Sequence, residues 1–201
     1  MPLQNRVDPF GELFAASARG MLMGNRGGRL HDDGRKLGKR RWTSKAWICC
    51  KLNFNNRHRN VWGEGYSELF FLDEVTAFAA GHRPCFECRR KDAERFAALF
   101  ARGRQRARAA VMDDMLHAER LDGKAKRLHQ RMIDSLPDGA MIALGGDAFA
   151  VRGKHLLRWT PSGYGHARPR PRGTQVDVLT PPSIVAVLAA GYTPLWHPSS
   201  G

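Results

Sequence analysis

The sequence has few cysteines, no long apolar segment and no leader-like start. Four cysteines in 201 residues are too few for the disulfide framework of a small secreted domain. No run reaches the eighteen consecutive apolar residues typical of a membrane-spanning helix. The first eight residues also lack the charged-then-apolar layout of a secretory signal. We therefore expect a soluble, cytoplasmic protein without a membrane partner, in which a close cysteine pair binds a metal rather than forming a crosslink.

Acidic residues are scarce as well. The chain has 33 lysines and arginines against 19 aspartates and glutamates, which gives a formal net charge of +14. The excess is concentrated in residues 1–108, which carry 22 basic and 11 acidic side chains. A basic protein of this kind is expected to bind a polyanion, and nucleic acid is the first candidate.

Residues 34–63 contain no carboxylate at all. Tryptophans alternate with cations in this stretch, a mixture that suits neutralisation of phosphates together with stacking on bases. The alternative is a solvated surface of loops and strands. We predict that the nucleic-acid contacts come from this stretch and from the two arginines that follow Cys88, namely Arg35, Lys36, Lys39, Arg40, Arg41, Lys45, Trp47, Arg57, Arg59, Arg89 and Arg90.

Hydrophobic periodicity predicts an α+β fold. Asp73 is the expected N-cap of a short helix that ends at Gly81, and Asp92 is the expected cap of a longer one. The expected strands are residues 21–23, 46–54, 59–62, 66–72, 140–144, 148–152 and 155–160, and the other expected helices are residues 107–121, 123–135 and 183–190.

We also predict two modules. Residues 1–108 form a basic, zinc-stapled module of a small β-hairpin and helices, preceded by an irregular N-terminal lead-in. Residues 109–201 form a helical linker followed by a smaller α+β module that contains a β-hairpin.

A Cys-x-x-Cys motif opens the longer of these helices. Its two sulfurs, from Cys85 and Cys88, can face one tetrahedral ion, and zinc is the metal that such sites commonly hold. A redox pair and two inert buried thiols are the alternatives. Because adjacent residues of a strand face opposite sides, only one of the neighbouring cysteines Cys49 and Cys50 is expected to join them. The remaining candidate ligands are Cys49 or Cys50 and one of the histidines His31, His58 and His82.

The region around this motif resembles a known family. It contains the aromatic pair Phe70-Phe71, a short alanine-rich segment ending at Gly81, and then Arg83-Pro84-Cys85-x-x-Cys88-Arg89. In composition and spacing, residues 70–90 resemble the second half of the metal-binding domain of the Ada DNA-repair protein. The whole chain also resembles a group of bacterial proteins that open with Met-Pro-Leu-Gln-Asn-Arg-Val, a likeness that supplies no activity.

The Ada resemblance implies a ligand set and a reaction. In that domain four cysteines hold zinc, and one of the first pair accepts a methyl group from a DNA phosphotriester. The resemblance implies Cys85 and Cys88 as zinc ligands and Cys50 by its position. The first pair in Ada is separated by three residues, whereas Cys49 and Cys50 are adjacent. We predict His31 as the fourth ligand, because a glycine-rich loop can fold back toward a strand.

The sequence thus predicts a zinc-containing nucleic-acid-binding protein in DNA repair or processing. One alternative is a zinc-thiolate methyl acceptor for DNA phosphotriesters. Another is a nuclease in which His117 and Glu119 act on a phosphodiester. Because residues two apart on a helix do not share a face, a surface or interhelical role for this pair is the simpler interpretation.

Overall fold

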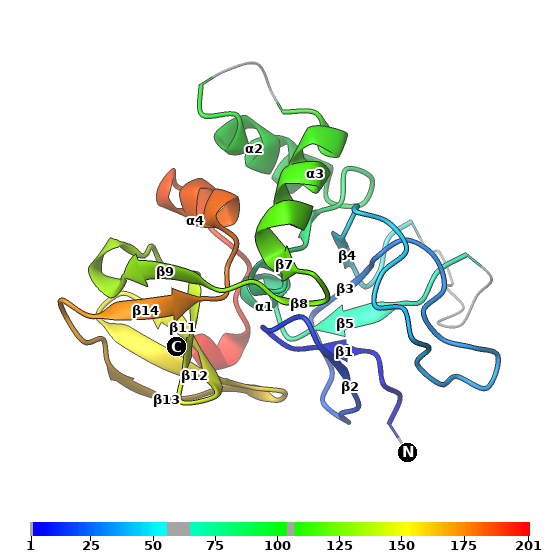
Figure 1. Ribbon diagram of the computed structural model, residues 1–201, viewed down its shortest axis with the longest axis horizontal. Helices are drawn as coiled ribbons and strands as arrows, with labels where there is room; N and C mark the ends of the chain where they lie inside the picture. Colours follow the sequence, from blue (N-terminus) through cyan, green and yellow to red (C-terminus); the bar gives the residue numbers. More distant parts are fainter. Residues whose placement is uncertain (1, 56–64, 104–106) are drawn as a thin grey trace.

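The fold combines two six-stranded sheets with a group of helices (Figure 1). The computed structural model of the chain describes residues 2–55, 65–103 and 107–201. The expected α+β class is confirmed. The predicted strand at residues 59–62 lies outside the described residues. The predicted division at residue 108 stays a prediction.

The first sheet comes from the amino-terminal part of the chain. Its strand order is β2-β1-β5-β3-β4-β6. The strands are β1 (Arg6–Val7), β2 (Leu13–Phe14), β3 (Leu22–Asn25), β4 (Ile48–Lys51), β5 (Leu69–Phe71) and β6 (Arg83–Pro84). β6 runs parallel to β4, with Cys49 opposite Pro84. This register brings the residues that follow β6 next to β4.

The second sheet is antiparallel and is as large as the first, with the order β13-β12-β11-β10-β14-β9. Its strands are β9 (His129–Met132), β10 (Met141–Leu144), β11 (Asp147–Arg152), β12 (His155–Thr160), β13 (Gly163–Pro169) and β14 (Gln175–Val178). The prediction of a helix over residues 123–135 is wrong. Four residue pairs, from His129 with Val178 to Met132 with Gln175, join β9 to β14 instead, and this long-range pairing overrides the local pattern.

Helix α1 (Glu74–Ala79) lies between the two sheets, and all six of its residues are buried. Ala77 packs in the apolar cluster of the first sheet, whereas Val75 packs against the second. Asp73 is the N-cap, as expected, and accepts a 2.8 Å hydrogen bond from the Thr76 backbone N–H. The same carboxylate accepts a 2.8 Å hydrogen bond from the Tyr164 hydroxyl of β13, which ties the helix to the second sheet.

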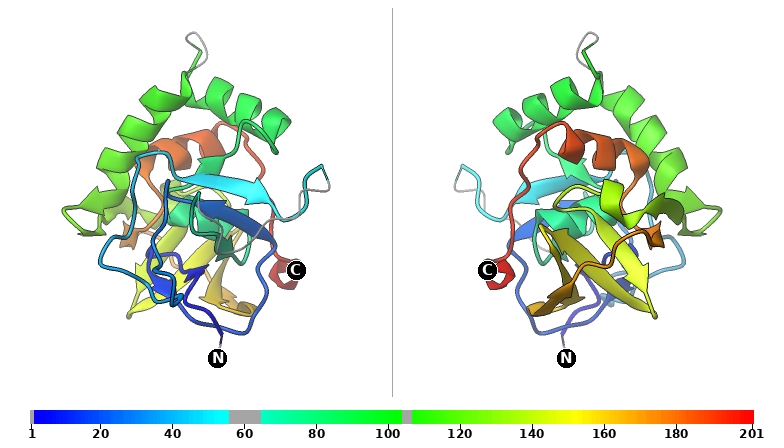
Figure 2. Two further views of the ribbon diagram at one scale, coloured as in Figure 1. Left: turned by 90° about the vertical axis from the view of Figure 1, so that its right-hand side faces the viewer. Right: turned by 90° about the vertical axis from the view of Figure 1, so that its left-hand side faces the viewer.

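Three further helices gather on one side of the molecule, as Figure 2 shows. They are α2 (Arg90–Phe100), α3 (Ala109–Arg120) and α4 (Pro182–Ala189). Their apolar faces share one core cluster, to which they contribute Phe96, Leu116 and Ile184. Asp92 is not the cap of α2, because the helix already begins at Arg90.

Short elements complete the described structure. They are the hairpin β7 (Leu121–Asp122) and β8 (Ala125–Lys126) after α3, and the single-turn helices η1 (Ile133–Ser135) and η2 (Pro198–Ser200). No helix within the described residues is long and apolar enough to cross a membrane.

Candidate metal centre and basic surface

Three cysteine sulfurs converge at the edge of the first sheet. Cys50 comes from β4, Cys85 follows β6, and Cys88 precedes α2. Their sulfur atoms all lie within 4.8 Å of one another. The three residues are 3%, 8% and 4% exposed, respectively, and Met23 packs with them. Sulfurs this close, without a disulfide between them, can hold one metal ion.

Backbone hydrogen bonds build this arrangement. The Cys85 N–H donates to the Cys49 carbonyl at 3.0 Å, which extends the pairing of β6 with β4 by one residue. The chain then turns, and the N–H groups of Glu87 and Lys51 lie 3.4 Å from the sulfurs of Cys85 and Cys88. Donors aimed at sulfur favour the thiolate form, which is the form that binds a metal.

The sulfurs also perturb one another. Hydrogen bonds from the thiols of Cys50 and Cys88 lower the pKa of Cys85 well below its ordinary value. Hydrogen bonding to the other two sulfurs, followed by burial, raises the pKa of Cys50. In the absence of a metal, the cluster therefore favours one thiolate that two thiols stabilise. A dication would favour deprotonation of all three, and a thiolate set of this kind suits a soft or borderline ion such as zinc.

Cys49 lies on the other face of β4, as strand geometry requires. It is fully buried among apolar side chains of the first sheet, including Phe71. Its sulfur lies 3.7 Å from Nη1 of Arg89. Burial raises the pKa of the Cys49 thiol, so this side chain is a core residue rather than a member of the cluster.

The prediction of His31 as the fourth ligand needs correction. Its Nδ1 lies 3.0 Å from the Ser67 hydroxyl, and its Nε2 lies 2.9 Å from the Gln4 carbonyl. Both ring nitrogens are therefore engaged away from the cysteine cluster. His82 is buried against the rings of Trp47 and Phe71 and does not join the cluster either. The third candidate, His58, lies outside the described residues.

Two of the predicted nucleic-acid contacts are buried. Trp47 is 2% exposed, and guanidinium groups of Arg26 and Arg120 lie over its ring with their Cζ atoms 3.8 and 3.9 Å from the ring centroid. Its faces are therefore occupied and cannot stack on a base. Arg89 is also buried, with ion pairs of 2.7 Å to Glu74 and 2.9 Å to Asp92. Both predictions are corrected, and sequence reasoning missed Arg26 and Arg120 because no local pattern links them to Trp47.

The other predicted cations that the structure describes lie on the surface. Lys45 and Arg90 form exposed ion pairs with Asp114 and Glu94. Arg41 is half-buried and donates a 2.6 Å hydrogen bond to the Gly38 carbonyl. Arg57 and Arg59 lie outside the described residues. The remaining four are exposed and share the loop between β3 and β4: Arg35, Lys36, Lys39 and Arg40.

The residues of the nuclease alternative have separate partners. Nδ1 of His117 lies 3.0 Å from Nη2 of Arg120. The Glu119 carboxylate accepts hydrogen bonds from the Ser183 N–H at 2.9 Å and the Ser183 hydroxyl at 2.6 Å. It thereby holds the first turn of α4 in place, which is the interhelical role expected as the simpler interpretation.

Family models, curated proteins and solved structures were compared with the chain, and none of them matches. The resemblance to the Ada metal-binding domain stays a prediction. The methyl-acceptor alternative, for its part, needs a sulfur that an alkyl phosphotriester can reach. Cys50, the residue placed by that resemblance, is 3% exposed, and this burial disfavours it as a nucleophile toward a large substrate.

Proposed function

We propose that this protein is a zinc-containing nucleic-acid-binding protein, with DNA as its favoured partner. The convergence of three buried sulfurs, from Cys50, Cys85 and Cys88, carries the metal part of the proposal. The nucleic-acid part is supported by the net charge of +14 and by the exposed cations of residues 35–40. The resemblance to the Ada domain supports DNA over RNA.

Zinc has a structural task in this arrangement. The three sulfurs belong to β4, to the turn after β6 and to the start of α2, so one ion would join three elements. Structural zinc sites contribute about 10 to 16 kcal/mol of apparent binding free energy to folding. His31 and His82 have other partners, so neither supplies the fourth ligand, and His58, the third candidate from the sequence, lies outside the described residues.

The metal proposal is tested by zinc content and stability. We expect one zinc per chain by elemental analysis of purified protein, and its loss in the Cys85→Ser variant. Cys49→Ser is the matched control, because Cys49 is buried beside the cluster but faces the other side of β4. This control should retain zinc even where its stability falls. Protein that carries no zinc and binds none when it is supplied would refute the proposal.

The nucleic-acid proposal places phosphates against the loop between β3 and β4. Arg35, Lys36, Lys39 and Arg40 are exposed there within six residues of chain. Asp32 and Asp33 are the nearby acids, and Asp33 is paired with Arg29 at 2.5 Å. The loop therefore keeps an excess of positive charge, which is the requirement for binding that depends on salt and not on sequence.

Titrations at several salt concentrations test this surface. Each phosphate contact contributes about 0.9 to the salt slope on duplex DNA and about 0.7 on a single strand. The double variant Lys39→Ala/Arg40→Ala should therefore bind more weakly to unrelated sequences, with a slope lower by about one to two. The matched control is Arg131→Ala/Arg172→Ala, which removes two exposed cations near the second sheet. Equal losses in both variants would contradict a specific surface.

A further inference from the structure

A pocket lined by cations lies beside Trp47, away from the cysteine cluster. Its wall comes from residues 10–12, Arg26, the segment at 41–47, Ala80 and the end of α3 with the β7-β8 hairpin. Five cationic side chains line it: Arg26, Arg41, Arg120, Lys124 and Lys126. Glu12, which is exposed, is the one carboxylate among the described lining residues. The pocket thus carries a large excess of positive charge.

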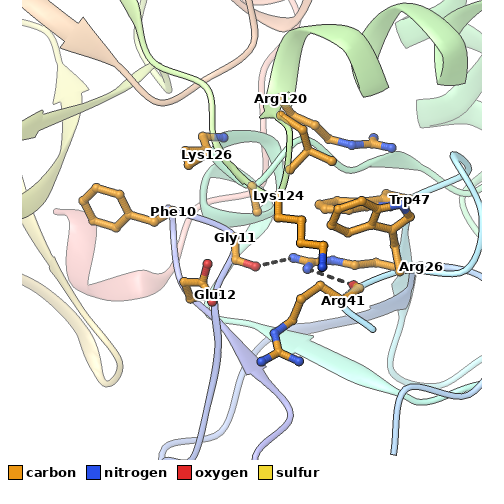
Figure 3. A pocket seen from close by; sticks show the side chains of 12 residues that line it. Phe10, Gly11, Glu12, Arg26, Arg41, Trp47, Arg120, Lys124 and Lys126 are labelled. Atoms are coloured by element: carbon orange, nitrogen blue, oxygen red, sulfur yellow. Dashed lines mark hydrogen bonds between the residues drawn. The ribbon is translucent and has the colours of Figure 1, made fainter. Parts of the chain in front are cut away.

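The Arg26 guanidinium is buried against neutral partners. The side chain is 1% exposed. It donates to the Gly11 carbonyl at 2.8 Å, to the Arg41 carbonyl at 3.4 Å and to Nε2 of His82 at 3.3 Å. Figure 3 shows the bond between Arg26 and the Gly11 carbonyl. Among the described residues, no carboxylate lies within ion-pair distance of Arg26, and a buried cation in that state is costly.

Arg120 repeats this situation on the other side of the Trp47 ring. It is also 1% exposed, and it donates to the carbonyls of Gly81 at 2.9 Å and Lys45 at 2.7 Å. Its Nε is buried and has no hydrogen-bond partner among the described residues. Buried N–H groups without a partner are rare in folded proteins, and each one calls for a partner such as an ion.

Lysines close the pocket from the β7-β8 hairpin. In Figure 3 the Lys124 side chain extends toward the guanidinium of Arg26, although both groups are cationic. Burial, followed by repulsion from Arg120 and Arg26, lowers the pKa of Lys126 to about 7. Asp8 and Glu12 attract Arg26 from outside ion-pair distance, which does not balance five cations. The arrangement is one that an anion would stabilise.

We propose that this pocket binds a phosphate dianion, either free or as the terminal phosphate of an ester. A dianion matches the excess charge better than a carboxylate, which carries a single charge. Its tetrahedral oxygens can also accept hydrogen bonds from donors on several sides, whereas a carboxylate offers two oxygens in one plane. Lys124 is the exposed donor at this site, while the Lys126 ammonium donates to the Ala79 carbonyl and adds its charge. The pocket and the cysteine cluster share no residue, so this site does not rest on the proposed function.

Calorimetry and thermal unfolding with inorganic phosphate test the site. Low millimolar phosphate should raise the melting temperature more than chloride or acetate at equal ionic strength, because specific binding to the folded state stabilises it. Lys124→Ala is the informative variant, because its side chain is exposed and its removal leaves the core intact. We expect it to weaken phosphate binding about tenfold, a loss equivalent to about 1.4 kcal/mol. Lys91→Ala, which removes an exposed lysine on α2, should bind phosphate as the unaltered chain does.

The two sources of the phosphate are separated by competition. An oligonucleotide with a 5′-phosphate is compared with the same oligonucleotide ending in a 5′-hydroxyl. Displacement of inorganic phosphate by the phosphorylated form alone assigns the site to a terminal phosphate, and displacement by neither assigns it to the free ion. A phosphate effect no larger than that of chloride, or one that Lys124→Ala leaves unchanged, would overturn the proposal. Because Lys39→Ala/Arg40→Ala tests a different surface, failure of one proposal is distinguishable from failure of the other.

Discussion

Arg83 and Asp113 form a two-pronged ion pair between β6 and α3, with Nε to Oδ1 at 2.7 Å and Nη2 to Oδ2 at 2.8 Å. Both side chains are buried. Arg83 lies two residues before Cys85, so the pair holds the strand that presents the first sulfur of the Cys-x-x-Cys motif. The helix α3 therefore supports the cysteine cluster without contributing a ligand.

Removal of this carboxylate should destabilise the fold strongly. Asp113→Ala leaves the Arg83 cation buried without its partner, and such a change costs about 3 to 5 kcal/mol. Asp114→Ala is the matched control, since it breaks only the exposed pair with Lys45 and should cost less than about 1 kcal/mol. Urea unfolding of the two variants measures the difference. If Asp113→Ala lost no more stability than Asp114→Ala, the buried pair would contribute little to the free energy of unfolding.

Metal removal should loosen the region around the cysteines. We expect a chelator to expose amide protons of β4 and β6 to hydrogen exchange, because without the ion no bond to a metal joins the three sulfurs that these elements carry. Strands of the second sheet such as β11 and β12 should keep their protection.

Alanine variants of two histidines assign the fourth ligand. His58→Ala should lower zinc affinity if this residue completes the site, and His31→Ala should leave affinity unchanged while lowering stability, because His31 bonds to Ser67 and Gln4. A loss of zinc affinity in His31→Ala would instead indicate that His31 is a zinc ligand. Unchanged affinity in both variants would exclude both histidines as the fourth ligand.

Substitution of Trp47 should act on stability and not on nucleic-acid recognition. Trp47→Ala removes a buried ring and leaves Arg26 and Arg120 facing each other, and truncations of this size cost about 3 to 5 kcal/mol. Trp47→Phe keeps an aromatic ring and loses the hydrogen bond from Nε1 to the Ser44 carbonyl, so its cost should be smaller. Thermal unfolding ranks the variants. A selective loss of single-strand affinity in folded Trp47→Phe would instead indicate base stacking.

The cationic pocket should make stability depend on pH. The pKa of Lys126 is lowered to about 7 in the folded state from an ordinary value of about 10.4. Between these values the unfolded chain binds a proton at Lys126 that the folded chain does not, so stability should rise as the pH increases through this window. Below about pH 7 both states are protonated, and the contribution levels off.

Urea unfolding between pH 7 and 10 checks this slope. Burial also lowers the pKa values of Arg26 and Arg120, but a guanidinium group stays protonated throughout this range and adds no slope. Lys126→Met should therefore reduce the slope, whereas Lys91→Met, at an exposed position of α2, should leave it unchanged. Equal slopes in both variants would contradict a depressed pKa at Lys126.

The sequence by itself determined the local features of this protein. Asp73 caps α1 because its carboxylate reaches an N–H three residues away, and the hairpin of β10 and β11 follows from two apolar runs around Gly145-Gly146. Cys85 and Cys88 lie together because two residues separate them on a turn. Each of these depends on neighbours within a few residues, which a pattern in the sequence contains.

Only the tertiary structure decided the long-range features. Residues 129–132 became a strand because β14 supplied their hydrogen-bond partners, and local preference is weak against such pairing. The choice of Cys50 over Cys49 depended on which face of β4 met the turn after β6. Trp47 proved to be a core residue because Arg26 and Arg120 lie over its ring. These contacts join residues more than twenty positions apart, and packing rather than sequence spacing selects them.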